Sequence, residues 1–303
     1  MKALVLGARG QLGSDLFAES TLEPAGWELV PIGRDQLDVD RPDTISHGLE
    51  GERFDALLNC TGYNRTDEAE ANASRAFAAN ARSVQEMARV CRSRGARLLH
   101  VSTDYVFGGE LRRPYRESDA PRPLNVYGAS KLTGETLAFR EHSDTVVLRV
   151  ASLFGVAGSS KPGGNFVEVV LRAGREQGKL QVVNDITMSP TATADVARWI
   201  FAVLREEVPA GTYHAVNAGS ATWHEFAVEI LRQAGVAAEV TPVTSAEYPA
   251  AAVRPAYSVL DNGLLTRIVG PIPPWQDALA RYLRAKEERS GAPVPRHEAG
   301  GSI

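Results

Sequence analysis

The sequence predicts an α/β protein with a doubly wound parallel sheet of the Rossmann type and a smaller C-terminal region. Three observations predict this fold class. Short apolar runs alternate with stretches of helical spacing, a glycine-rich turn follows the first apolar run, and the alternation is lost after about residue 151. A length of 303 residues allows two modest domains or one large α/β unit.

Five largely apolar runs are expected to be strands buried on both faces of a parallel sheet. Residues 68–94 have helical spacing, with alanines, Phe77 and Met87 on one face and arginines and glutamates on the other. We expect one helix there. The five strand runs cover residues 3–6, 27–32, 54–60, 98–102 and 145–150.

The second half of the chain has a looser pattern. A Gly- and Ser-rich stretch covers residues 155–164, and prolines concentrate after residue 241, which indicates a smaller, loop-rich region built on the sheet. Residues 287–303 are polar and aperiodic, so we expect a disordered tail. Helices are expected at residues 166–177, 194–204 and 223–234, and a strand at residues 212–216.

Composition excludes several classes of protein. With 33 Lys and Arg against 37 Asp and Glu, the net charge of −4 is not that of a generic nucleic-acid binder. Cys60 and Cys91 are too few for a disulfide framework or a four-ligand zinc site. No apolar run approaches the ~20 residues of a membrane span. We therefore expect a cytoplasmic protein with neither nucleic-acid nor membrane partners.

Gly7, Gly10 and Gly13 stand three residues apart where the first strand is expected to turn into a helix. Backbone N–H groups and the positive end of the helix can bind a pyrophosphate there, and only glycine lets the backbone approach so closely. A tight turn with incidental glycines is the alternative. The position directly after a buried strand favours a dinucleotide site.

The end of the second expected strand bears on the choice of cofactor. An acidic residue there holds the ribose 2′-hydroxyl of NAD, whereas an arginine suits the 2′-phosphate of NADP. The strand is followed by Arg34, which favours NADPH, with NADH as the alternative. Asp38 and Val39 are candidate contacts of the adenosine, although Asp38 could instead cap the next helix.

Tyr127 and Lys131 are four residues apart on one predicted helix and therefore share a face. A tyrosine has a pKa of ~10, and a fixed ammonium nearby favours the phenolate and lowers that pKa toward a range useful for proton exchange. The chain has five lysines against 28 arginines, so this spacing is less readily accidental. A solvated surface pair is the alternative.

Ser102 and Thr103 stand at the end of the expected strand 98–102. The carboxyl ends of strands in an open parallel sheet face the ligand crevice. A hydroxyl there can hydrogen-bond a substrate carbonyl or Tyr127. The alternative is that the two hydroxyls only cap a turn.

Six runs of residues together resemble the dTDP-4-dehydrorhamnose reductase family, a branch of the extended short-chain dehydrogenases/reductases. The resemblance covers about residues 1–286 in consistent order. Ser-Thr-Asp-Tyr-Val-Phe at 102–107 and Leu-Asn-Val-Tyr-Gly-Ala-Ser-Lys at 124–131 are specific to that branch, whereas the glycine loop is not. The remaining runs are residues 7–13, 59 with 67–70, 184–185 with 189–191, and 254–255 with 258–261.

The resemblance implies NAD(P)H-dependent reduction of the C4 keto group of a nucleotide-linked deoxysugar. The substrate would be dTDP-4-dehydro-L-rhamnose, giving dTDP-L-rhamnose, or a related dTDP-4-keto sugar of a secondary-metabolite pathway. Tyr127 would donate the proton to the C4 oxygen, and Thr103 would orient it. Lys131 would hold the nicotinamide ribose and lower the pKa of Tyr127, while Asp104 would touch the sugar. The implied cofactor contacts are Gly10, Gln11 and Leu12 at the pyrophosphate, Asp38 and Val39 at the adenosine, and Gly62 and Tyr63 at its middle.

Two departures from the family pattern bear on these expectations. Cys60-Thr61-Gly62 stands where the family usually has three alanines, a change that still allows a backbone contact with the cofactor. Leu153 stands where a tryptophan commonly packs on the sugar, so Leu153 is a candidate substrate contact and the identity of the sugar stays open. Some members bridge a dimer through magnesium. The sequence has no acidic cluster that indicates such a site, so we expect no metal and leave a homodimer open.

These motifs divide the chain into a dinucleotide-binding domain, residues 1–150 with about 180–217, and a substrate-binding domain, about 151–179 with 218–286. Two other functions stay open. An epimerase or dehydratase of the same superfamily would retain a tightly held NAD⁺, and the branch-specific runs argue against it. A non-catalytic NADP-binding regulatory subunit would lack turnover, and the intact Thr103, Tyr127 and Lys131 argue against it.

Overall fold

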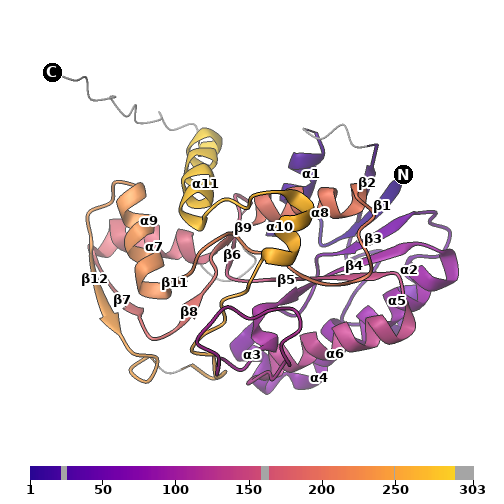
Figure 1. Cartoon of the computed structure of the whole chain (residues 1–303), viewed down its shortest axis with the longest axis horizontal. Coiled ribbons are helices and arrows are strands. Elements are labelled where there is room, and N and C mark those ends of the chain that lie inside the picture. Colours follow the sequence, from indigo (N-terminus) through magenta and orange to yellow (C-terminus); the bar gives the residue numbers. More distant parts are fainter. Residues whose placement is uncertain (22–25, 158–163, 249, 291–303) are drawn as a thin grey trace.

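The computed structural model describes residues 1–21, 26–157, 164–248 and 250–290 (Figure 1). Its largest feature is a six-stranded sheet in which every neighbouring pair of strands is parallel. The predicted doubly wound fold is confirmed. In spatial order the strands are β10 (Gly211–His214), β5 (Thr145–Val150), β4 (Arg97–Thr103), β3 (Ala56–Asn59), β1 (Lys2–Leu6) and β2 (Glu28–Ile32).

The strand order reverses at β1, because β2 pairs with one side of β1 and β3 with the other. In a doubly wound sheet such a reversal leaves a crevice at the carboxyl ends of the strands. The glycine-rich turn follows β1 directly and therefore lies at this crevice.

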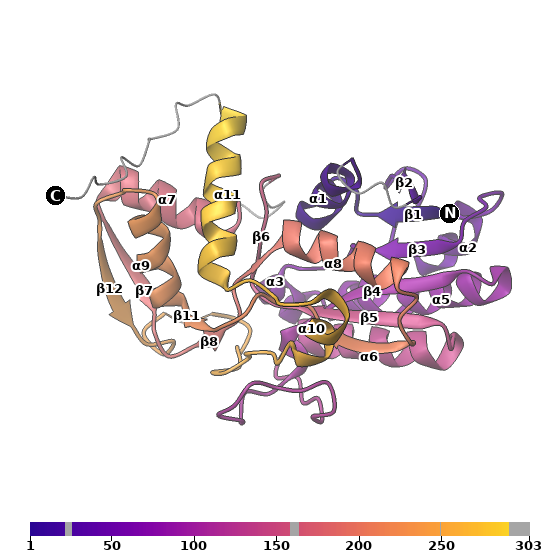
Figure 2. The same cartoon turned by 45° about the horizontal axis from the view of Figure 1, so that its top comes forward.

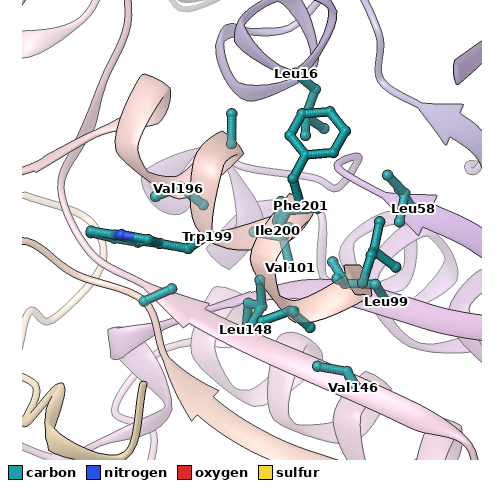
Figure 3. Close-up of a cluster of buried hydrophobic side chains, with 14 of the residues drawn as sticks. Leu16, Leu58, Leu99, Val101, Val146, Leu148, Val196, Trp199, Ile200 and Phe201 are labelled. Carbon is teal, nitrogen blue, oxygen red and sulfur yellow. The ribbon is translucent and has the colours of Figure 1, made fainter. Parts of the chain in front are cut away.

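Both faces of the sheet are buried, which explains why β1, β3 and β5 are largely apolar. On one face α1 and α8 pack on the strands, and Figure 3 shows Ile200 and Phe201 of α8 near Leu16 of α1. On the other face, α5 contributes to a second cluster. Within β3, Leu58 belongs to the first cluster and Leu57 to the second. The helices on the two faces are α1 (Gln11–Ser20), α8 (Thr193–Arg205), α2 (Ile45–Gly48), α5 (Ser83–Arg94) and α6 (Val126–Glu141).

The single helix expected over residues 68–94 is wrong. Asn72 leaves helical dihedral angles, and its Nδ2 donates to the carbonyl of Glu68 at 2.8 Å, a local bond by which asparagine competes with the helix. Further on, a π-helical turn carries Asn80, whose side chain bonds the main chain of Tyr63. The segments are α3 (Thr66–Ala71), α4 (Ala73–Phe77), the π-helical turn Ala78–Arg82, and α5.

A separate hydrophobic core lies beside the large sheet, where α7 and α9 pack together and α11 stands between them and the sheet (Figure 2). The helices expected at residues 166–177, 194–204 and 223–234 are confirmed as α7, α8 and α9, and the strand at 212–216 as β10. The remaining elements are β6 (Leu153–Phe154), α7 (Phe166–Gln177), β7 (Lys179–Val183), β8 (Thr187–Met188), β9 (Thr191–Ala192), β11 (Ala221–Thr222), α9 (Trp223–Gln233), β12 (Glu239–Val243), α10 (Gly263–Val269) and α11 (Trp275–Ser290).

The disordered tail was expected from residue 287, and this boundary is wrong because α11 continues to Ser290. Glu287, Glu288 and Arg289 are good helix formers, and with Ser290 they extend the helix by about one turn. Residues 291–303 lie outside the described residues. In the described part of the chain, no helix is both long and apolar enough to cross a membrane.

Candidate active site

A cavity of about 1220 Å³ opens at the carboxyl ends of the sheet strands, and side chains of the separate core form its opposite wall. All the residues predicted to bind cofactor or substrate line this cavity, with the exception of Gly13. The fold therefore brings together residues that are more than 140 positions apart, such as Gly7 and Leu153.

The glycine loop has two positions at which only glycine fits. Gly7 has a φ of +80°, and a Cβ on Gly13 would collide with the carbonyl oxygen of Gly7. Gly13 thus acts by letting α1 pack against the loop, although it does not line the cavity. Gly10 is the N-cap of α1 and makes no side-chain cap, so the first N–H groups of this helix remain available to an anion. The loop fits the pyrophosphate of a dinucleotide.

Tyr127 lies in the first turn of α6 and lines the cavity. Asn125 caps this helix, because its Oδ1 accepts from the N–H of Gly128 at 2.8 Å. Burial raises the pKa of Tyr127 to about 12, although a hydrogen bond with the Thr103 hydroxyl lowers it. At neutral pH the phenol keeps its proton, which is the state that a proton donor requires.

The expected lowering of the Tyr127 pKa by Lys131 is wrong for the protein without ligands, because burial dominates. The Lys131 ammonium instead donates to the carbonyl of Val101 at 2.6 Å, and its Nζ lies 3.4 Å from Nε2 of His100. Burial lowers the pKa of Lys131 to about 8. A Cβ at Gly62 would lie only 2.8 Å from Oδ1 of Asn80, so a side chain does not fit at this position, which lies beside the Lys131 ammonium.

Lys131 rests on a buried polar layer that the sequence analysis did not predict. Beneath it, Nδ1 of His100 and Nδ2 of Asn59 are 3.0 Å apart. Asn80 of the π-helical turn donates to the hydroxyl of Ser130 in α6 at 2.9 Å. Buried polar groups need hydrogen-bond partners. Asn59 and His100 stand within largely apolar strands, and this placement in the sequence indicates that they pair with other buried polar groups.

Asp104 follows β4 and is buried beside Thr103, whose hydroxyl donates to Oδ1 of Asp104 at 3.1 Å. Burial raises the pKa of Asp104 to about 6, although hydrogen bonds with Ser258 and Thr103 lower it. The negative charge of Asp104 also contributes to the raised pKa of Tyr127. The carboxyl therefore changes its charge near neutral pH, close to the phenol.

We expect Asp104 to reduce the stability of the protein as the pH rises through about 6. Its folded pKa lies above the usual 3.8, so the folded chain binds this proton more tightly than the unfolded chain. The resulting stabilisation is complete below about pH 3.8 and is lost as the pH passes the folded pKa. Between pH 4.5 and pH 7.5 the wild type should therefore lose about 2 kcal/mol of unfolding free energy that Asp104→Asn, which has no carboxyl group to titrate at this position, does not lose. Urea unfolding at both pH values measures this, and a pH-independent difference would contradict it.

Arg34 lies at one end of the cavity, just after β2. Its guanidinium contacts Asp40 at 2.9 Å and Asp38 at 3.4 Å. Oδ1 of Asp38 also accepts from the N–H of Asp40 at 3.1 Å, so Asp38 caps a turn, whereas the N-cap of the next helix is Arg41. Val39 continues this cavity wall. The exposed guanidinium is suited to a phosphate.

The opposite end of the cavity has an aromatic wall. Leu153 of β6 lines it together with Phe166 and Trp223, whose ring centroids are 4.6 Å apart. Arg254 also lines the cavity and pairs with Asp67 at 2.7 Å. Phe166 and Trp223 were not predicted as site residues, because they belong to different helices and no local motif marks them. They give this end an aromatic surface although position 153 is leucine.

A family model described as the RmlD substrate binding domain matches residues 1–288. The chain belongs to this family. The dTDP-4-dehydrorhamnose reductase of Streptomyces griseus is 37% identical to this chain, and the match covers 96% of each protein. The family resemblance seen in the sequence is thereby confirmed.

Solved structures agree with the family assignment. A dTDP-4-dehydrorhamnose reductase from Bacillus anthracis, in complex with NADP, superposes with a TM-score of 0.85 at 34% identity and covers 94% of this chain and 99% of its own. A dTDP-glucose 4,6-dehydratase from Streptomyces venezuelae has a TM-score of 0.76 at 20% identity, covering 96% of this chain and 98% of its own. The second likeness shows a shared fold alone.

Proposed function

We propose that this chain catalyses the NADPH-dependent reduction of the C4 keto group of a dTDP-4-keto deoxysugar, namely dTDP-4-dehydro-L-rhamnose or a related sugar. One observation carries the proposal. Tyr127, protonated and hydrogen-bonded to Thr103, lines the same cavity as the glycine loop and lies one helical turn from the buried Lys131. The names of the relatives support the substrate class, and the NADP complex of the Bacillus anthracis protein supports the cofactor.

We assign the cofactor to the part of the cavity that runs from the adenosine end past the first turn of α1 to Lys131. The open N–H groups of this turn suit the pyrophosphate. Gly62 and Lys131 line the same part of the cavity, and the Lys131 ammonium would hold the nicotinamide ribose there. The proposed contacts are Gly7, Gly10, Gln11 and Leu12 at the pyrophosphate, Arg34, Asp38 and Val39 at the adenosine, and Gly62, Tyr63, Tyr127 and Lys131 toward the nicotinamide.

When bound, NADPH supplies the hydride that reduces C4. Tyr127 donates its phenolic proton to the C4 oxygen as negative charge develops there. The Thr103 hydroxyl holds the phenol in place. The ammonium of Lys131, fixed by the carbonyl of Val101, would hold the nicotinamide ribose. Asp104 and Leu153 are placed to contact the sugar.

We propose that the two halves of the cavity correspond to two domains. The sheet with its two hydrophobic clusters binds the cofactor, and the separate core around α7, α9 and α11 binds the substrate. The division at residues 151–179 and 218–286 needs an adjustment, because β7 pairs with β12 and β8 pairs with β11. We therefore move the boundary to the end of β8 at Met188.

Consumption of NADPH with a panel of dTDP-4-keto sugars tests the function. We expect turnover with at least one sugar and a product that has gained a hydroxyl at C4. An epimerase or dehydratase would instead be purified with tightly held NAD⁺ and would not consume NADPH. A regulatory subunit would bind NADPH and reduce none of the sugars.

We expect NADPH to be preferred over NADH by roughly tenfold in kcat/KM, because Arg34 can form a charge-assisted hydrogen bond with the 2′-phosphate. Arg34→Ala should remove most of this preference through a higher KM for NADPH, while the kinetics with NADH stay nearly unchanged. Steady-state kinetics with both cofactors measure the effect. Equal use of the two cofactors by the unmutated protein would show that Arg34 makes no such contact.

A further inference from the structure

A second arginine reaches the adenosine end of the cavity. Arg75 of α4 lines the cavity, as Arg34 does, and both guanidinium groups bind the same oxygen, Oδ2 of Asp40. The distances are 2.9 Å from Nη2 of Arg34 and 2.6 Å from Nη2 of Arg75. Nε of Arg75 lies 3.0 Å from the same oxygen. Two segments distant in sequence thus bring two positive charges to one point.

Most of the donors of these two arginines remain free for a ligand. Each guanidinium has five N–H donors. Three hydrogen bonds in total reach Asp40, and Nε of Arg34 also lies 3.4 Å from Oδ1 of Asp38. The side chains of Arg34 and Arg75 are 71% and 55% exposed. Exposed ion pairs of this kind contribute little to folding stability, so stability alone does not account for the arrangement.

Tertiary contacts place Arg75 at this position. Its guanidinium carbon lies 5.4 Å from the centroid of the Tyr63 ring, which also lines the cavity. The interruption of the helix at Asn72 makes α4 a separate short helix, and Arg75 lies within it. The guanidinium is held between an aromatic face and a carboxylate.

We propose that Arg75, together with Arg34, binds the 2′-phosphate of NADPH. The two groups already converge on a carboxylate oxygen, and the oxygen atoms of a phosphate can accept charge-assisted hydrogen bonds from both planar guanidinium groups. This assignment rests on the proposed function, because only the phosphorylated cofactor carries an anion at that position. NADH presents a neutral hydroxyl there and gains nothing from the second arginine.

Equilibrium binding tests the assignment without turnover. Dissociation constants for NADPH, NADH and 2′,5′-ADP are measured by calorimetry on the wild type, Arg75→Ala and Arg89→Ala. Arg89 is the matched control, because it is a half-exposed arginine on α5 that pairs with Glu141 and does not line the cavity. We expect Arg75→Ala to weaken NADPH and 2′,5′-ADP by roughly tenfold and NADH by less than about twofold. Arg89→Ala should change none of the three.

Equal weakening of NADPH and NADH by Arg75→Ala, or an unchanged affinity for NADPH, would overturn the assignment. Arg75→Lys gives a second test if the alanine variant does not fold, because lysine keeps the charge and loses the two-pronged geometry. It should bind NADPH more weakly than the wild type and NADH equally well; equal affinity for NADPH would again overturn the assignment. If no keto sugar is reduced while Arg75 still discriminates the cofactors, the reductase function fails and the phosphate site stands.

Discussion

Tyr127→Phe should lower kcat by roughly 10²–10⁴-fold, the usual contribution of a positioned general acid. Burial raises the pKa of the phenol to about 12, so the wild type holds the proton that the C4 oxygen needs. Phenylalanine keeps the ring, including its edge contact with Tyr105 at 5.9 Å between centroids. The fold and the affinity for NADPH should therefore survive. Steady-state kinetics, thermal unfolding and cofactor binding together measure these three expectations.

The matched control for this variant is Tyr213→Phe. This substitution also removes a phenolic hydroxyl, which in Tyr213 donates to the carbonyl of Pro209 at 2.8 Å. Tyr213 does not line the cavity. This variant should lose about 1 kcal/mol of stability and no activity. Turnover by Tyr127→Phe at the wild-type rate would remove the phenol from the mechanism.

Lys131→Met should lower kcat by about 10²-fold or more and weaken NADPH binding at the same time. The ammonium is buried beneath the cavity, bound to the carbonyl of Val101 at 2.6 Å. We propose that it holds the nicotinamide ribose in the position from which the hydride is transferred, and methionine fills a similar volume without the charge. Kinetics and calorimetric binding measure the two losses. Lys179→Met, an exposed lysine of β7, is the control and should change neither.

The unfolding stability of Lys131→Met distinguishes a role of Lys131 in catalysis from a role in holding the fold together. Burial lowers the pKa of Lys131 to about 8, below its usual 10.5. Because the unfolded chain then binds this proton more tightly, the charged lysine destabilises the fold below about pH 8, and this penalty disappears as the pH rises toward 10.5. Lys131→Met should therefore unfold at pH 7 no more readily than the wild type. A variant that lost stability but kept its kcat would contradict the proposed role.

The helix expected at residues 68–94 shows where sequence reasoning fails. Its apolar spacing correctly identified the buried face, with Met87 and Val84 in the core. The spacing did not reveal the break at Asn72 or the π-helical turn. The π-helical turn depends on contacts of Asn80 with the main chain of Tyr63 and with Ser130 of α6, which the spacing of apolar residues does not encode. The pKa of Tyr127 differs from the expectation for a similar reason. Burial, which only packing sets, raises this pKa, and a spacing of four residues leaves the direction of the Lys131 ammonium undetermined.

The amino-acid sequence by itself determined the fold class, the six strands of the large sheet, the position of the glycine loop and the membership of the family. These features follow from local requirements: apolar strands for a sheet buried on both faces, glycine where the backbone turns with positive φ, and a short run of specific residues. The tertiary structure alone decided the buried layer of His100 and Asn59 under Lys131, the aromatic pair of Phe166 and Trp223, and the approach of Arg75 to Arg34. The physical reason is that burial, pKa and ligand geometry depend on which distant segments meet, and only packing sets those distances.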